Sequence, residues 1–153
     1  MQKEGVLGKE EWITAENIIH SLQELLCPRE FNYLTIDLDG NDYYILKEIL
    51  RSGYRPRLIM AEFNAIFNSS EKRTIKYDPK HKWGKDDYYG FSFAQGKHLF
   101  NYYGYNIVYQ TDNLNLYAVL RDFIPFDDLE VEAKYTQINY HPHRKNAEWK
   151  TDL

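Results

Sequence analysis

The sequence predicts an α/β fold in which about four strands form one sheet, parallel except for a final antiparallel hairpin strand, flanked by about three helices. Three observations predict it. Apolar residues at helical spacing alternate along the chain with short apolar runs that are typical of strands. Glycine or proline follows several of these segments, where a helix is expected to end. The last two apolar runs are separated by a connection too short for a crossover, so they are expected to pair antiparallel.

The first half of the chain alternates between helices and strands. A helix is expected over residues 15–26, where apolar residues follow helical spacing and Thr14 is placed to cap the N-terminus. A strand is expected over residues 33–38, followed by a second helix over residues 41–51. The continuous apolar run over residues 58–63 is typical of a strand that is covered on both faces.

A long polar connection over residues 64–90 separates the two halves. A connection of this length within a compact domain is usually functional or mobile. A third helix is expected over residues 92–103. It is followed by strands over residues 105–110 and 115–121, which a short turn joins into a hairpin.

Composition sets the organisation of the chain and argues against several classes of function. We expect one α/β unit over residues 14–122, a flexible arm over residues 1–13 and a polar extension over residues 123–153. The net charge of −4 gives no general attraction to nucleic acid, and no apolar run reaches membrane length. The single cysteine excludes an internal disulfide, and no signal peptide is evident. We therefore expect a cytoplasmic protein that binds neither nucleic acid nor membranes.

Two carboxylates lie where the strand over residues 33–38 ends. In an open α/β sheet, ligands bind beyond the carboxyl ends of the strands. Asp37 and Asp39 are therefore predicted catalytic residues, able to position a hydroxyl or to hold a divalent cation through oxygen ligands. The alternative interpretation is a strand-to-helix turn in which side chains from Asp39 to Asp42 cap the next helix. Capping alone does not account for Asp37.

Two further polar residues, Glu62 and Asn64, mark the end of the strand over residues 58–63. Parallel neighbours have their carboxyl ends at the same edge of a sheet, so these side chains are expected to face the same crevice as Asp37. We predict Glu62 as a third catalytic residue. The alternative is that polar residues simply occupy an exposed strand end.

Three segments together resemble the second half of an S-adenosylmethionine-dependent methyltransferase of the FkbM-like family. They are LTIDLDGNDYYILKEIL over residues 34–50, RPRLIMAEFN over residues 55–64 and YDPKHKWGKDDYYG over residues 77–90. The hairpin at the end is similar to the closing hairpin of that family, so the resemblance covers about residues 14–122. It implies a partial Rossmann-like methyltransferase sheet, S-adenosylmethionine as cofactor and methyl transfer to an oxygen of a small-molecule or sugar acceptor.

The resemblance also implies roles for the remaining polar residues. In that family the cofactor is held by an earlier half with a glycine-rich turn, whereas the eight glycines of this chain are scattered and form no such turn. The resemblance therefore implies the acceptor-side half of the enzyme and identifies no cofactor-binding residues. The residues expected to bind substrate are Asn41, Asn64, Asp78, Trp83, Asp87 and Tyr88.

The strand over residues 33–38 is expected to leave one edge without a partner. An open apolar edge favours pairing with another chain. We therefore expect a second copy in a homo-oligomer, a partner chain or the chain's own tail to cover that edge.

Other interpretations remain open at this point. The chain is alternatively a non-catalytic binding or assembly module of the same fold. A metal-dependent phosphohydrolase is the third interpretation, with Asp37 as nucleophile and Lys85, Asp86 and Asp87 as its other groups. His141 and His143 have no third ligand nearby in the sequence, so no metal-binding residues are assigned.

Overall fold

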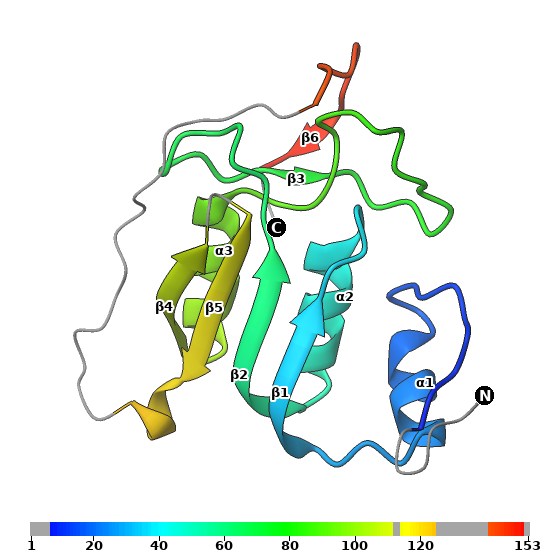
Figure 1. Ribbon diagram of the computed structural model, residues 1–153, viewed down its shortest axis with the longest axis vertical. Helices are drawn as coiled ribbons and strands as arrows, with labels where there is room; N and C mark the ends of the chain where they lie inside the picture. Colours follow the sequence, from blue (N-terminus) through cyan, green and yellow to red (C-terminus); the bar gives the residue numbers. More distant parts are fainter. Residues whose placement is uncertain (1–6, 112–113, 125–140, 152–153) are drawn as a thin grey trace.

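The computed structural model describes residues 7–111, 114–124 and 141–151. Figure 1 shows a sheet of four strands with α2 and α3 on one face and α1 beside the sheet. The elements in chain order are α1 (Ile18–Glu24), β1 (Glu30–Ile36), α2 (Asp42–Arg51), β2 (Arg55–Glu62), β3 (Thr74–Ile75), α3 (Phe93–Tyr102), β4 (Tyr105–Thr111), β5 (Asn115–Leu120), the short 3₁₀ helix η1 (Arg121–Phe123) and β6 (Trp149–Lys150).

The main sheet has the strand order β1-β2-β5-β4. β1 and β2 are parallel, whereas β5 runs antiparallel to both of its neighbours, β2 and β4. A mixed α/β fold with four strands, three α-helices and a closing antiparallel hairpin is therefore confirmed. The sequence did not indicate that β5 inserts between β2 and β4, nor that β3 and β6 form a second, two-stranded sheet.

The core lies between the sheet and the two helices that cover it. Ile59 and Ala61 of β2 and Leu116 of β5 are fully buried on the covered face, against apolar residues of α2 such as Leu46. On the opposite face Met60 is only half-buried. The expectation that this strand is covered on both faces is therefore corrected, because among the described residues α2 and α3 cover one face alone.

The first helix is shorter than its apolar spacing predicted. It begins at Ile18 because Asn17 Oδ1 accepts a hydrogen bond from the backbone N–H of Thr14 (2.7 Å), which folds the preceding residues into a turn. It ends at Glu24 because Leu26 takes the left-handed conformation (φ 53°), in which the chain leaves a helix. Thr14 therefore precedes a turn instead of capping the helix.

The two parallel strands are displaced from their predicted bounds. β1 begins at Glu30 and ends at Ile36, so Asp37 is the first residue after the strand. β2 begins at Arg55, before its apolar run, because Pro56 is aligned with Phe31 of β1. The pairing of neighbouring strands, which local sequence does not report, sets both limits.

The described parts of the two terminal segments are attached to the domain. In the predicted arm, residues 1–6 lie outside the described residues, and Trp12 Nε1 donates a hydrogen bond to the carbonyl of Pro79 (2.8 Å). In the predicted extension, residues 125–140 and 152–153 lie outside the described residues. Residues 141–151 return to the long connection, where β6 pairs with β3 beyond the carboxyl ends of β1 and β2 (Figure 1).

β1 is an edge strand, as the sequence predicted. Within residues 7–111, 114–124 and 141–151, no strand pairs with its outer side, and the returning tail pairs with β3 instead. A second copy or a partner chain at that edge stays a prediction. None of the described helices is long and apolar enough to cross a membrane.

Candidate functional site

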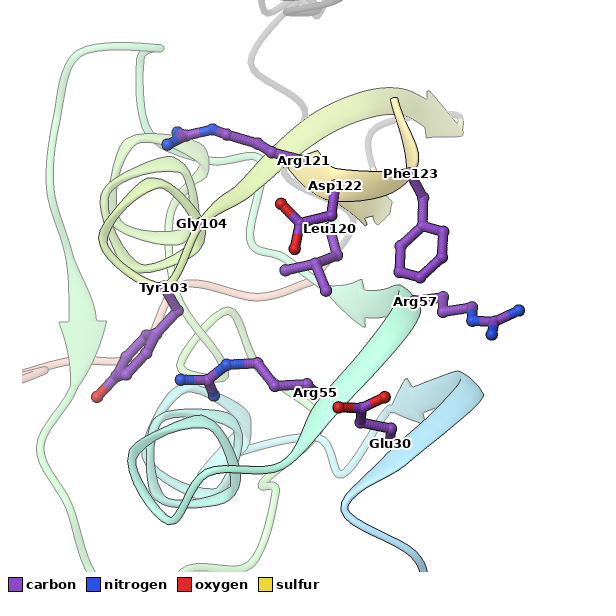
Figure 2. A pocket seen from close by; sticks show the side chains of 9 residues that line it. All are labelled: Glu30, Arg55, Arg57, Tyr103, Gly104, Leu120, Arg121, Asp122 and Phe123. Carbon is purple, nitrogen blue, oxygen red and sulfur yellow. The ribbon is translucent and has the colours of Figure 1, made fainter. Parts of the chain in front are cut away.

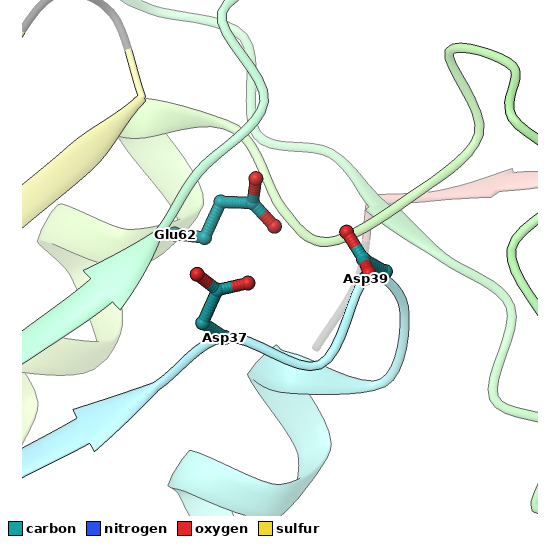
Figure 3. Close-up of side chains that lie close together, drawn as sticks. All are labelled: Asp37, Asp39 and Glu62. Atoms are coloured by element: carbon teal, nitrogen blue, oxygen red, sulfur yellow. The ribbon is translucent and has the colours of Figure 1, made fainter.

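Three carboxylates converge at the carboxyl ends of β1 and β2. Asp37 follows Ile36, which is aligned with Ala61 of β2, so Asp37 lies beside Glu62. Asp39 comes from the turn that leads into α2, and Figure 3 shows its carboxylate across a gap from those of Asp37 and Glu62. One oxygen of each residue lies within 4.8 Å of the other two. The structure thus brings together the three residues that the sequence predicted as catalytic.

Asp42 shapes the turn that carries Asp39. Its carboxylate is buried and accepts hydrogen bonds from the backbone N–H groups of Leu38 and Gly40, both at 2.8 Å. The acidic side chain therefore bonds backward into the turn, whereas the alternative interpretation of the sequence was a cap on α2. Asn41 at the N-cap makes no side-chain cap bond. The turn places Asp39 in the left-handed region (φ 53°), which costs free energy for a residue with a Cβ.

Electrostatic repulsion within the cluster is strong because one member is buried. Glu62 is 9 % exposed. Burial, followed by the charges of Asp37, Asp42 and Asp39, raises the pKa of Glu62 to about 8. Burial and the charge of Asp39 also raise the pKa of Asp37. An arrangement of this kind favours a bound positive species, either a proton or a cation.

A buried side-chain oxygen on the strand next to Glu62 was missed by sequence reasoning. Asn115, the first residue of β5, is aligned with Glu62, which places the two side chains on the same face of adjacent strands. Asn115 Oδ1 and Glu62 Oε2 are both buried, and neither has a hydrogen-bond partner. A polar residue at the start of a strand is a weak signal. Only the insertion of β5 beside β2 makes Asn115 a neighbour of the carboxylates.

The two asparagines predicted to bind substrate donate hydrogen bonds to the polar connection. Asn64 is fully buried, and its Nδ2 donates to the carbonyls of Asp87 (2.8 Å) and Tyr89 (3.1 Å). Asn41 Nδ2 donates to the carbonyl of Asp78 (2.7 Å). These amide groups hold the connection over residues 64–90 against the ends of β2 and α2.

The other predicted substrate residues contact the connection itself and the returning tail. Buried Asp87 accepts a hydrogen bond from the backbone N–H of Arg144 (2.8 Å) and contacts the ring of His143. Tyr88 donates its hydroxyl to the carbonyl of Glu148 (2.8 Å), and Trp83 Nε1 donates to the carbonyl of Asp86 (2.8 Å). Asp78 and Tyr88 also line a hollow of about 250 Å³ between the connection and the tail.

These contacts also bear on the phosphohydrolase interpretation. Asp86 Oδ2 accepts a hydrogen bond from Arg144 Nε (2.6 Å), and Asp87 is bonded to the tail as described above. The two acids that this interpretation needs beside Asp37 are thus engaged in holding the tail. The connection does approach the acidic turn at one point, where the N–H of Gly90 donates to the carbonyl of Gly40 (3.0 Å).

A second hollow, of about 460 Å³, lies at the opposite end of the sheet, where the chain enters β1 and β2 (Figure 2). Its three arginines are already partnered. Arg55 donates to the carbonyls of Leu50 and Tyr54, Arg121 donates to Asn106, and Arg57 stacks on Phe123. These contacts hold the three arginines in the wall of the hollow.

Comparisons of the chain with protein-family models, with curated proteins and with solved structures gave no match. The chemistry of the site is accordingly argued from its own residues. What they offer is a cluster of oxygen acceptors, open on the side of Asp37 and Asp39 and buried on the side of Glu62.

Proposed function

We propose that this chain is a methyltransferase-like module that binds the acceptor in methyl transfer to oxygen. The observation that carries the proposal is the convergence of Asp37, Asp39 and Glu62 at the carboxyl ends of a parallel strand pair. Carboxylates accept strong hydrogen bonds from hydroxyl groups, so several of them fix the orientation of a hydroxylated acceptor. Orientation is the main requirement when a methyl group moves in line between two atoms.

The order of the strands supports the same proposal. A parallel pair followed by a closing antiparallel hairpin is the arrangement that the resemblance to FkbM-like methyltransferases implies for a Rossmann-like sheet. The predicted substrate residues Asp78, Trp83, Asp87 and Tyr88 receive a supporting role in this proposal. Asp87 and Tyr88 bond residues 141–151, the Trp83 ring contacts His141, and Asp78 lines the hollow between the connection and the tail.

The described residues do not fit S-adenosylmethionine, so no step of the proposal passes through it. No glycine-rich turn follows a strand in the described part of the chain. Gly40, in the turn after β1, is covered by protein, because a Cβ added there would lie 2.4 Å from Cδ2 of His81. The proposal therefore assigns to this chain the acceptor side of the reaction.

This lack of fit favours a second candidate, a non-catalytic module that binds the same acceptor. The two candidates share the carboxylate site and differ in whether methyl transfer follows binding. Incubation of the chain and an acceptor with S-adenosylmethionine labelled in its methyl group separates them. Label in the acceptor supports catalysis by the chain itself, and unlabelled but bound acceptor supports the module.

Acceptor binding is tested by calorimetric titration of the full chain with a panel of monosaccharides and methyl glycosides. We expect saturable binding of at least one compound. Asp37→Asn is expected to weaken that binding about 10- to 100-fold, the loss for one hydrogen bond to a charged group. Asp122→Asn makes the same change on an exposed residue of η1, at the opposite end of the sheet, and is expected to bind like the wild type. Absence of binding, or equal binding by Asp37→Asn, overturns the proposal.

A further inference from the structure

We infer that Asp37, Asp39 and Glu62, together with Asn115 Oδ1, form a binding site for a hard divalent cation. The inference deepens the proposed function by naming a ligand of the same site. It rests on that function for its purpose but not for its test, because cation binding is measured without acceptor or cofactor.

The spacing of the carboxylates fits one cation. Two oxygens bound to the same ion are separated by at most twice the metal–oxygen distance, which is about 4.2 Å for Mg²⁺ and about 5 Å for Ca²⁺. The three carboxylate oxygens lie within 4.8 Å of one another. This spacing is compatible with binding of all three oxygens to one Ca²⁺. Because Asp37 and Asp39 are exposed, a small rotation of either brings the set to the tighter spacing of Mg²⁺ or Mn²⁺.

A second, independent observation points to a ligand. Glu62 is more than nine-tenths buried, and its Oε2 has no hydrogen-bond partner although it is shielded from water. Asn115 Oδ1, on the neighbouring strand, is buried and unpartnered in the same way. A buried acceptor without a donor is unfavourable, so two such acceptors on adjacent strands favour a shared positive species.

The negative charge of the cluster also favours a divalent cation. Within the part of the chain that the structure describes, none of the three carboxylates forms an ion pair with a lysine, arginine or histidine. The nearby Asp42 adds negative charge, and both of its carboxylate oxygens accept hydrogen bonds from backbone N–H groups of the turn. A divalent ion would compensate the acids, and carboxylate and amide oxygens are the ligands that hard cations prefer.

The cation would give the site a way to hold its acceptor. With three carboxylates and one amide oxygen from the protein, a six- to eight-coordinate ion keeps positions open on the exposed side of Asp37 and Asp39. Hydroxyl oxygens of an acceptor are suitable ligands for these positions. Vicinal hydroxyls would bind most tightly, because they can occupy two adjacent positions.

The test titrates the full chain, freed of metal by EDTA and dialysis, with CaCl₂, MgCl₂ and MnCl₂ by calorimetry, and counts free Mn²⁺ by electron paramagnetic resonance. We expect one saturable site per chain with a dissociation constant of about 10⁻³ M or tighter. Glu62→Gln and Asp37→Asn are each expected to weaken binding at least about tenfold, and Asn115→Ala about threefold. Asp122→Asn is expected to leave it unchanged.

A second measurement separates loss of the site from loss of the fold. The thermal midpoint of the wild type is expected to rise with cation concentration, and that of folded Glu62→Gln is expected to stay constant. Absence of saturable binding for all three cations, or an equal loss in Asp122→Asn, overturns the inference. If the chain binds an acceptor but none of the three cations, the proposed function stands and only this inference is overturned. If it binds a cation but no acceptor, this inference stands and the proposed function is overturned.

Discussion

Glu62 and Asp42 both have buried carboxylates, but they differ in their hydrogen-bond donors. Asp42 receives two backbone N–H donors at 2.8 Å, whereas Oε2 of Glu62 receives none. A buried carboxylate with donors stabilises a turn, and one without donors destabilises the fold when it ionises. The first arrangement is typical of structural residues and the second of functional ones.

Glu62→Gln is expected to change the pH dependence of stability. The pKa of Glu62 is raised to about 8 by burial and by Asp37, Asp42 and Asp39. Between about pH 4.5 and pH 8 the folded chain keeps a proton that the unfolded chain has lost, so the free energy of unfolding falls by about 1.4 kcal/mol per pH unit. Glu62→Gln does not undergo this loss of stability and should be more stable than the wild type near pH 8.5, by on the order of 4–5 kcal/mol.

Urea unfolding in EDTA at about pH 5 and about pH 8.5 measures this difference. The two proteins are expected to be similar at the lower pH, where Glu62 is protonated in the folded chain. Glu10→Gln, the same change at an exposed position, serves as the control and should follow the wild type at both values. A Glu62→Gln variant less stable than the wild type at the higher pH contradicts the prediction.

Asp42→Ala is expected to destabilise the acidic turn. The substitution removes the acceptor of the buried Gly40 N–H and of the part-buried Leu38 N–H, at a cost of about 2 kcal/mol. The urea midpoint is expected to fall accordingly. Asp122→Ala removes an exposed carboxylate and should leave the free energy of unfolding within about 0.5 kcal/mol of the wild-type value. An unchanged midpoint in Asp42→Ala would show that water replaces the carboxylate.

Packing of helices on the sheet depends on close approach at particular positions. Gly96 lies in α3, where a Cβ would come within 2.5 Å of Cε2 of Phe91 and 3.2 Å of Cδ1 of Leu116. The glycine costs helix propensity but allows α3 to pack closely against the buried ring and against β5. Ser92 is the N-cap of the same helix, and its Oγ accepts a hydrogen bond from the N–H of Gln95.

Gly96→Ala is therefore expected to destabilise the protein, although alanine favours a helix. The gain in propensity is about 1 kcal/mol, whereas overpacking against the fully buried Phe91 costs about 1–3 kcal/mol. We expect a net loss of about 1 kcal/mol in thermal or urea unfolding. Gly8→Ala, where the added Cβ meets nothing within 4 Å, is the control. A gain in stability for Gly96→Ala would mean that α3 moves away from the sheet at little cost.

The molecule as a whole has two layers that are held together in different ways. The main sheet and its helices share an apolar core. The connection over residues 64–90 and the tail over residues 141–151 are joined by a two-residue strand pair, ion pairs and aromatic contacts. Contacts of the second kind are weaker, so this layer is expected to open before the core does.

Arg144→Ala is expected to loosen the tail selectively. Arg144 Nε bonds Asp86 at 2.6 Å, and its guanidinium lies 4.8 Å from the ring centre of Tyr88. Hydrogen exchange of the amides in residues 141–151 should become about tenfold faster, which corresponds to about 1.4 kcal/mol, with β2 amides unaffected. Lys145→Ala removes an adjacent exposed charge and should change neither. Equal acceleration in β2 would show that the tail belongs to the global unfolding unit.

Local sequence was sufficient for the types of most elements and insufficient for their limits. The apolar spacing of α2 predicted residues 41–51, and the structure has Asp42–Arg51. For α1 the same reasoning failed at both ends. The turn at Asn17 delays the start of the helix, and the left-handed conformation of Leu26 ends it early. Strands β3 and β6 have two residues each and carry no periodic signal.

The sequence by itself determined the alternation of helices and strands and the three carboxylates at the strand ends, because apolar periodicity and residue type are local properties. Only the tertiary structure decided that Asn115 lies beside Glu62, that Asp42 bonds backward into the turn, and that Asp87 and Tyr88 hold the tail. Which strand lies beside which, and which buried oxygen finds a donor, depends on residues far apart in the chain. The free energy of the whole packed domain selects those partners, and a short segment of sequence does not contain it.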